Sequence, residues 1–281
     1  MAISSTSTKE APNHPDAVRN HPLASGRPGF SLGNFIPTAI TALAIGWALH
    51  GAEFNLGELV HDAPNMWRFL ASLFPPDLHF FLDQDHVIQP TISTIQLAVV
   101  GTSVAVVLAF PLSILAARNL APPWLYQTLR SLLSILRAIP EFIWAIMFVS
   151  AVGLGVFAGT LALVAGSVGS LSKVFAESIE AIDPRPVEAL EAVGARQVQA
   201  VSFAVLPQAL PNLVSYIMLN FEHNIRASFI VGFVGGGGLG FEVQTETGIF
   251  KYHQFLDHLI IIIVLVVLAD RLSALVRKRL V

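Results

Sequence analysis

The chain has 281 residues, of which 54% are hydrophobic and only 12% are charged, and its formal net charge is −3. Soluble domains carry about twice this share of charged residues, roughly 25%. The composition therefore excludes a disordered chain, a coiled coil and a nucleic-acid-binding protein with a basic face. The chain contains no cysteine, which excludes disulfides, thiolate metal sites and cysteine nucleophiles.

The first 30 residues are polar and rich in Ser, Thr, Pro and Asn. We expect residues 1–30 to form a flexible cytoplasmic tail. The apolar stretch that follows is long and shows no small-residue cleavage site, so we do not expect a cleavable signal peptide.

Four long segments carry no charged residue: 28–52, 91–117, 142–172 and 197–221. A helix needs about 20 apolar residues to cross roughly 30 Å of hydrocarbon. Only helices and closed barrels satisfy the backbone in lipid, and these segments lack the alternation of barrel strands. The sequence therefore predicts an all-α, polytopic membrane protein with about six transmembrane helices.

The positions of these helices follow from the uncharged segments and from the glycines that interrupt them. The predicted spans are 33–50, 91–117, 134–152, 159–180, 205–225 and 255–276. Between the first two spans, apolar residues recur at helical spacing from Met66 to Phe74. We expect a short helix there, packed on the outer ends of the spans.

Lysine and arginine are distributed unevenly between the predicted connecting segments. The C-terminal tail carries Arg277, Lys278 and Arg279, whereas segment 51–90 has a single basic residue, Arg68, among six acidic ones. Cytoplasmic loops of membrane proteins carry an excess of Lys and Arg. We therefore expect both termini to lie in the cytoplasm.

The segment between the fourth and fifth predicted spans has the pattern of two short helices joined by a turn. Good helix formers at 188–192 precede Gly194, which permits a left-handed turn, and 195–204 can form a second helix. Its characteristic residues are Glu188, Ala189, Leu190, Gly194, Leu206 and Pro207. Their spacing resembles the EAA loop of ATP-binding-cassette (ABC) importer permeases. Leu190 replaces the second alanine of that motif, and Ala204 stands where isoleucine is common.

The resemblance implies that the loop 183–204 couples the membrane domain to a separate ABC ATPase. A short helix along the membrane surface can fit a groove of a soluble subunit and transmit its closure as a rotation of membrane helices. The six characteristic residues are then the ATPase-coupling residues, with Glu188 offering a charge to the groove. An ordinary connecting loop is the alternative.

A second region, 222–240, reads EHNIRASFIVGFVGGGGLG. It resembles the segment that follows the EAA loop in phosphonate and methionine permeases, and the matching residues are Asn224, Arg226, Ala227, Gly232, Gly235, Gly237, Gly238 and Gly240. Five glycines among six residues cannot continue a membrane helix, and broken backbone at this depth is tolerated only inside protein or beside a water-filled cavity. The expected pathway-lining residues are Asn224, Arg226, Ser228, Gly235, Gly237 and Gly238. Close helix packing by small residues is the alternative.

Two pairs of charged residues lie in or near the predicted spans. Glu222 and Arg226 are four residues apart, as are Lys173 and Glu177, so each pair can meet on one helix face. Either these pairs stabilise helix packing, or Arg226 faces the pathway and meets an anionic substrate.

Several catalytic and binding motifs are absent from the sequence. It has no Walker A motif, no metal-binding His-Glu-x-x-His and no Gly-x-Ser-x-Gly. We therefore expect no catalytic residue, metal or cofactor in this chain, with ATP hydrolysed by a separate subunit.

The resemblance to ABC permeases extends over most of residues 91–276 and is closest to phosphonate permeases. It implies a type I importer permease fold, with the first transmembrane helix and an external segment at 31–90 and the permease domain at 91–281. The implied substrate is a small phosphorus oxyanion such as phosphonate, phosphite or hypophosphite. The implied partners in a bacterial inner membrane are an ABC ATPase, a periplasmic or lipid-anchored binding protein and a second permease chain, identical or related, with no nucleic acid.

Two other classes of protein are alternatives. A secondary transporter driven by an ion gradient would need an acidic coupling site in the membrane, for which Glu141 and Glu177 are candidates. A membrane-embedded enzyme would need a catalytic constellation that the sequence lacks.

Overall fold

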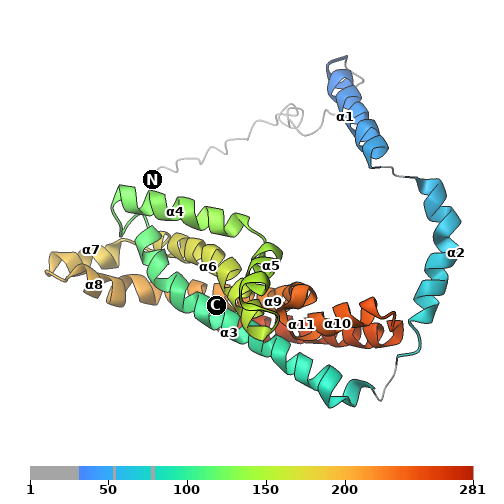
Figure 1. Ribbon diagram of the computed structural model, residues 1–281. Helices are drawn as coiled ribbons and strands as arrows, with labels where there is room; N and C mark the ends of the chain where they lie inside the picture. The colour runs from blue at the N-terminus through green and yellow to red at the C-terminus, as the bar shows by residue number, and fades with distance from the viewer. Residues whose placement is uncertain (1–31, 53–54, 77–79, 281) are drawn as a thin grey trace, which may run out of the picture. The chain divides into compact units, whose positions relative to one another are not determined.

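The structure is a computed structural model that describes residues 32–52, 55–76 and 80–280 (Figure 1). The chain divides into two units, residues 1–65 and 66–281. All regular secondary structure in the described residues is helical, as the sequence predicts. The predicted tail 1–30 lies outside the described residues.

The first unit contains helix α1 (Leu32–Gly51) and the beginning of α2 (Leu56–Ser72). Helix α1 coincides with the predicted span 33–50 and carries no charged residue. Helix α2 includes most of the short helix expected from Met66 onward.

The second unit is built around α6 (Val156–Glu180), which packs against α3 (Gln89–Ala116), α4 (Pro123–Ala138), α5 (Glu141–Val152) and α9 (Leu206–Val231). The buried side of α6 consists largely of Gly, Ala and Ser. Small residues let neighbouring membrane helices approach closely, which explains how one helix contacts four others.

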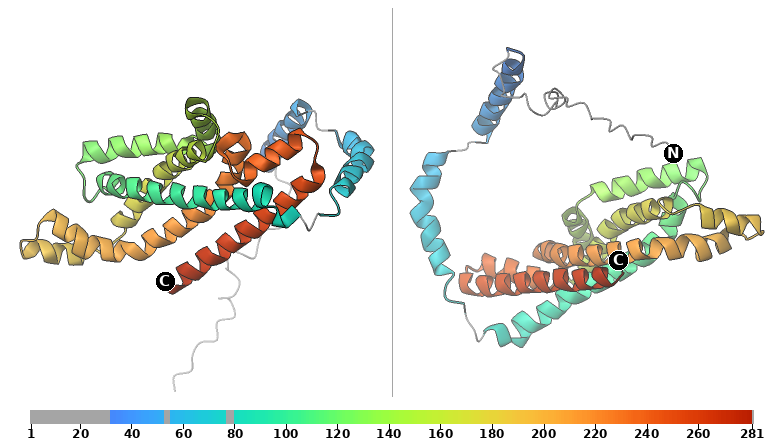
Figure 2. Two further views of the ribbon diagram at one scale, coloured as in Figure 1. Left: turned by 60° about the horizontal axis from the view of Figure 1, so that its bottom comes forward. Right: turned by 180° about the vertical axis from the view of Figure 1, so that it is seen from behind.

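Helix α11 (Tyr252–Leu280) packs along α9 and along α10 (Leu239–Gly248), as Figures 1 and 2 show. Two short helical segments, η1 (Phe80–Leu82) and η2 (Gln84–Ile88), precede α3. A further one, η4 (Gly232–Gly236), continues α9.

Four helical runs among the described residues are long and apolar enough to cross a membrane: Gln84–Ala116, Val156–Glu180, Gln197–Gly236 and Tyr252–Arg279. Helices α4 and α5 bring the number to five if together they make one bent span. The predicted number of about six spans is not confirmed, and α1 is not among these four runs.

The predicted span 134–152 is wrong as a single helix, because α4 and α5 meet at an angle of 83°. Helix α4 ends at Ala138, and Ile139 is extended, with φ −87° and ψ 116°. Pro140 lacks an amide hydrogen and disfavours helical backbone in the residue before it, so the chain turns here. Residues 137–141 form this turn, which we call the elbow.

The glycine run ends the helical run that contains α9, as the sequence predicts. Gly235, Gly237 and Gly238 have positive φ angles of 101°, 81° and 73°. The backbone after the turn packs directly against the end of the helical run, with no side chain between the two main chains. A Cβ atom on Gly232 would lie 2.4 Å from the carbonyl oxygen of Gly237. A Cβ atom on Gly159 of α6 would lie 2.5 Å from the carbonyl oxygen of Gly236.

Candidate coupling and translocation sites

The loop expected to couple to an ATPase forms the predicted first helix and turn, but the prediction of a separate second helix at 195–204 is wrong, because residues 197–236 form one continuous helical run. Helix α7 (Arg185–Ala192) is followed by a turn and by α8 (Gln197–Ala200), which continues through η3 (Val201–Val205) into α9. Figures 1 and 2 show α7 and α8 projecting at one end of the second unit. Gly194 makes the turn in the left-handed region, with φ 81°.

The turn is closed by backbone hydrogen bonds and by one side chain, since the amide of Arg196 donates to the side-chain oxygen of Gln199 (2.8 Å). The amide of Gly194 donates to the carbonyl of Glu191 (2.9 Å), and the amide of Ala195 donates to that of Leu190 (3.0 Å). These bonds satisfy carbonyl groups at the end of α7. No atom lies within 4 Å of a Cβ built on Gly194, so the tip of the loop is open.

Helix α7 buries none of its residues in the second unit. Glu188 and Ala189 are exposed and Leu190 is half-buried, so the first three coupling residues lie on an accessible helix. Leu206 and Pro207 lie at the first turn of α9, half-buried and exposed respectively. The structure therefore places the six candidates on one continuous segment without bringing them together around a cavity.

The base of the loop is closed by hydrogen bonds between its two ends. The amide of Asp183 donates to the side-chain oxygen of Gln208 (3.1 Å), and the Gln208 amide donates back to the Asp183 carbonyl (3.3 Å). The Asp183 carboxylate also pairs with Arg185 (2.5 Å). The Arg185 guanidinium holds the pKa of the Asp183 carboxyl below its ordinary value.

A second set of contacts fastens this end of the unit and was missed by the sequence reasoning. Glu180 at the end of α6 pairs with Arg130 of α4 (2.9 Å) and accepts the amide of Arg118. Arg130 also donates to the carbonyl of Ala116 (3.1 Å). No spacing rule predicts this network, because its members come from three separate segments.

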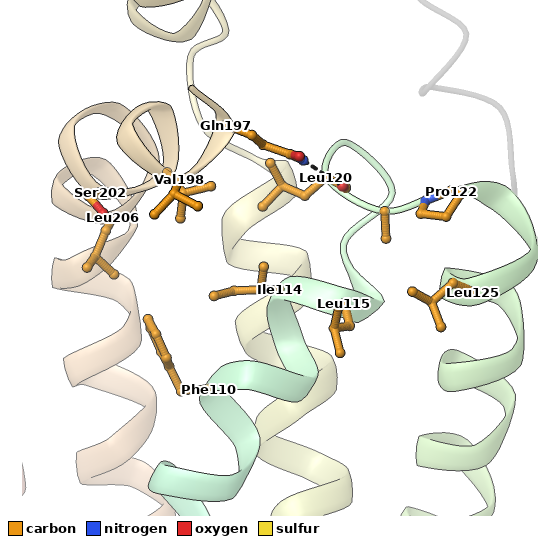
Figure 3. Close-up of a pocket in the computed structure, with 12 residues that line it drawn as sticks. Phe110, Ile114, Leu115, Leu120, Pro122, Leu125, Gln197, Val198, Ser202 and Leu206 are labelled. Atoms are coloured by element: carbon orange, nitrogen blue, oxygen red, sulfur yellow. Dashed lines mark hydrogen bonds between the residues drawn. The ribbon is translucent and has the colours of Figure 1, made fainter. Parts of the chain in front are cut away.

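The loop contacts the membrane helices across an apolar pocket of about 440 Å³ (Figure 3). Gln197 of α8 donates to the carbonyl of Leu120 (2.9 Å). The figure shows Phe110 and Ile114 of α3 on one side of the pocket and Val198 on the other. Helix α8 is therefore tethered by a hydrogen bond with open space beside it.

The expected pathway residues separate into buried and exposed positions. Asn224 is fully buried and joins three helices: it donates to Thr102 of α3 (2.9 Å) and accepts from Ser167 of α6 (3.0 Å). Ser228 is also buried, and its hydroxyl donates to the carbonyl of Ile225 (2.7 Å). Both side chains therefore have partners inside the helix packing.

The three expected glycines make the turn after α9. A Cβ atom on Gly235 would lie 2.2 Å from the side chain of Leu154, and one on Gly238 would lie 2.6 Å from Oγ1 of Thr94. Gly237 packs similarly against Val156. Neighbouring atoms of the same chain therefore occupy the space that a side chain at each of these three glycines would need.

Arg226 is the expected pathway residue whose side chain is exposed, by 51%. It donates to Glu222 (2.7 Å), which confirms the predicted pair four residues apart. Lys173 and Glu177 form no ion pair within the described residues, so the pairing considered for them is wrong. Spacing alone could not separate the two cases, because it does not fix side-chain direction.

A polar pocket of about 330 Å³ lies between the elbow, α6 and α9. Glu141 of α5 pairs there with His223 of α9 (3.1 Å), which the sequence reasoning did not single out. Gly166 makes room for this pair, since a Cβ atom would lie 2.7 Å from Cγ of Glu141. A Cβ atom on Gly169 would lie 2.9 Å from the amide nitrogen of Arg137, so this glycine seats the elbow on α6.

No group of three or more His, Asp or Glu side chains in residues 32–52, 55–76 and 80–280 could hold a metal ion. The exposed loop and the polar pocket are therefore the two candidate functional sites in the described chain.

Comparison with known proteins identifies the class of protein to which these features belong. The chain is 37% identical over 255 residues to the phosphite transport system permease protein PtxC of Stutzerimonas stutzeri, covering 89% of this chain and 92% of PtxC. It is 42% identical over 189 residues to the phosphate-import permease protein PhnE of Mycolicibacterium smegmatis, covering 67% of this chain and 36% of PhnE.

A chain of the MetNI methionine ABC transporter in an inward-facing conformation has a similar fold, with a TM-score of 0.61 and 24% identity, covering 69% of this chain and 95% of that chain. This likeness shows the type I ABC importer permease fold. Residues 109–281 match the family of binding-protein-dependent transport system inner membrane components. The chain belongs to this family and is a multi-pass permease subunit of an inner membrane.

Proposed function

We propose that this permease carries a small phosphorus oxyanion across the inner membrane, driven by a separate ABC ATPase. The observation that carries the proposal is the exposed helix–turn–helix 183–204, because a permease with no ATPase motif of its own needs a surface through which an ATPase acts. The substrate class is supported by PtxC and PhnE, which are described as phosphite and phosphate permeases.

The loop is built as a small rigid lever. Its base is closed by Asp183 and Gln208, its turn is set by Gly194, and α7 has an exposed side free to enter a groove. A push on α7 passes through α8 directly into α9, because α8, η3 and α9 form one helical run. In this proposal Glu188, Ala189, Leu190, Gly194, Leu206 and Pro207 form the coupling segment.

The remaining partners follow from the same proposal. The loop end of the unit faces the cytoplasm together with both termini, which agrees with the basic C-terminal tail. A periplasmic or lipid-anchored binding protein delivers substrate at the opposite end, and a second permease chain, identical or related, completes the pathway. The wall of this pathway is supported by the helix packing of Asn224, Ser228 and the glycines of the turn. The exposed side chain of Arg226 offers the pathway a cation.

The test is a charge reversal on α7 in the complex expressed with its ATPase and binding protein. Glu188→Lys should reduce ATP-dependent uptake of phosphite and retention of the ATPase during purification by at least tenfold, with unchanged membrane abundance. Asp270→Lys is the matched control, because it makes the same charge change at an exposed carboxylate on α11, outside the loop 183–204. Equal effects of the two substitutions, or uptake that needs no ATP, would contradict the lever.

A further inference from the structure

We propose that the polar pocket between the elbow, α6 and α9 is an oxyanion-binding subsite of the translocation pathway, with Arg137 as its cationic group, a ring nitrogen of His223 as a further hydrogen-bonding group and Glu141 as an internal competitor for the substrate. This inference rests on the proposed function for the identity of the anion. The charged and hydrogen-bonding groups of the proposed subsite all belong to residues that the structure describes.

The pocket lies near the middle of membrane-spanning helices. Its α6 wall includes Gly166, Ser167 and Ser170, close to the midpoint of Val156–Glu180. Its α9 wall includes Tyr216 and His223, inside the run Gln197–Gly236. A ligand held here is therefore well inside the membrane.

The side of α9 that lines the pocket is polar although it is uncovered. Residues at spacings of four and three fall on one side of a helix. The exposed residues in this register are Asn212, Tyr216, Leu219, His223, Arg226 and Ile230. From Asn212 to Arg226 the polar positions extend over about 21 Å at 1.5 Å per residue.

Exposure of an ionisable side chain to lipid costs free energy, so such side chains in membrane helices usually face protein or water. The His223 side chain is 49% exposed and that of Glu141 is 31% exposed. By contrast, the exposed positions along the middle of α11 are all apolar, among them Ile263, Val267 and Leu268. The α9 surface therefore faces water or another protein chain, whereas the α11 surface fits lipid.

The pocket offers hydrogen-bond donors in excess of acceptors. Arg137, Ser170 and Tyr216 make no side-chain hydrogen bond to another described residue. Asn220 accepts from Asn224 through its carbonyl oxygen (3.2 Å), which leaves its amide group as a donor. The best complement to such a set is a small ligand with several acceptor oxygens and negative charge.

The Glu141 carboxylate is paired with His223 (3.1 Å). An anion that binds to Arg137 and His223 must compete with this carboxylate, which lowers its affinity. A transport site must release its ligand as well as bind it, so an internal competitor suits a pathway better than a storage site. Removal of Glu141 should thus tighten binding and slow release, whereas removal of Arg137 should weaken binding.

The first experiment tests water access and charge preference without reference to the transported substrate. Because the natural chain has no cysteine, Tyr216→Cys introduces a single thiol. The complete complex in vesicles is treated with a negatively or a positively charged methanethiosulfonate reagent, and modification of the Tyr216→Cys chain is followed by mass spectrometry. We expect the negatively charged reagent to react at least tenfold faster than the positively charged one. Adding Arg137→Gln should abolish this preference. Val267→Cys on α11 is the control and should stay unmodified.

The second experiment measures uptake of radiolabelled phosphite and of phosphate, each in turn. Arg137→Gln should raise KM at least tenfold, and Glu141→Gln should lower both KM and the maximal rate. Lys173→Gln, on the same helix as Ser170 but outside the pocket, is the matched control and should change neither.

The outcomes separate the two proposals. An unreactive Tyr216→Cys, or faster modification by the cationic reagent, overturns the subsite, because the surface is then covered by another chain or selects the wrong charge. Equal KM shifts in the same direction for Arg137→Gln and Glu141→Gln also overturn it. Anion-selective modification without uptake of either phosphorus compound keeps the subsite and overturns only the proposed substrate class.

Discussion

Two histidine–glutamate pairs hold different parts of the second unit, and they differ in burial. His258 of α11 is fully buried against Glu246 of α10 (2.8 Å), and its other ring nitrogen donates to the carbonyl of His86 (2.7 Å). His223 has one bond, to Glu141, and is half-exposed. The same two residue types therefore close one site and leave the other available to a ligand.

The buried pair joins two consecutive helices to a segment that is far away in sequence. His258 connects α11 to α10 through Glu246 and to η2 through His86, and the ring of Phe80 meets it edge-on with centroids 5.3 Å apart. Both ring nitrogens face oxygen acceptors, so every polar atom of the imidazole is used. A buried polar group whose hydrogen bonds are all satisfied stabilises the fold, whereas a polar group with an unused hydrogen-bonding position can bind a ligand.

The largest expected effect is that of His258→Ala. It leaves the Glu246 carboxylate buried without its partner, which costs about 3–5 kcal/mol of folding free energy. Thermal unfolding in lipid nanodiscs should show a large loss of Tm. Adding Glu246→Gln should recover part of the loss, because it removes the unpaired charge. A Tm equal to that of the unmodified chain would show that the pair is not structural.

A smaller effect is expected for His223→Ala in the same measurement. The side chain is half-exposed and its pair with Glu141 is open to solvent on one side, so stability should change by no more than about 1 kcal/mol. The comparison fails if His223→Ala and His258→Ala lower the Tm equally. It is sharpened if His223→Ala leaves the Tm unchanged while altering uptake kinetics.

The smallest effect is expected at the exposed pair of Asp183 and Arg185. Because Arg185 lowers the pKa of Asp183 in the folded chain, this pair stabilises the loop above the ordinary aspartate pKa of 3.8 and loses its effect as the pH falls through the lower folded value. The Tm difference between the unmodified chain and Asp183→Asn should be constant from pH 8 to about pH 5 and shrink toward lower pH. A difference that grows on acidification would reverse the assigned sign.

The features that the sequence predicted are those set by neighbours along the chain. The turn at Gly194 follows from helix formers before it and a residue that tolerates positive φ. The pair of Glu222 and Arg226 follows from their spacing, and the break at 235–238 follows from the glycines.

The features that sequence reasoning missed depend on contacts between distant segments. His223 meets Glu141, 82 residues away, only because the elbow folds the start of α5 against α6 and α9. The proline at position 140 indicates the bend, but the apolar segment around it has the length of one straight span, so length and composition alone favour the wrong geometry. Lys173 and Glu177 show the converse, since favourable spacing did not bring them together.

The contact between Gly159 and Gly236 has a consequence for how the permease can move. Where two main chains touch without side chains between them, there is no rotamer to adjust, so a shift of even one ångström produces either a collision or a void. Helix α6 and the glycine turn must consequently travel as one solid block. Any rearrangement that alternately exposes the pathway therefore has to take up its bending at contacts other than the one between α6 and the glycine turn.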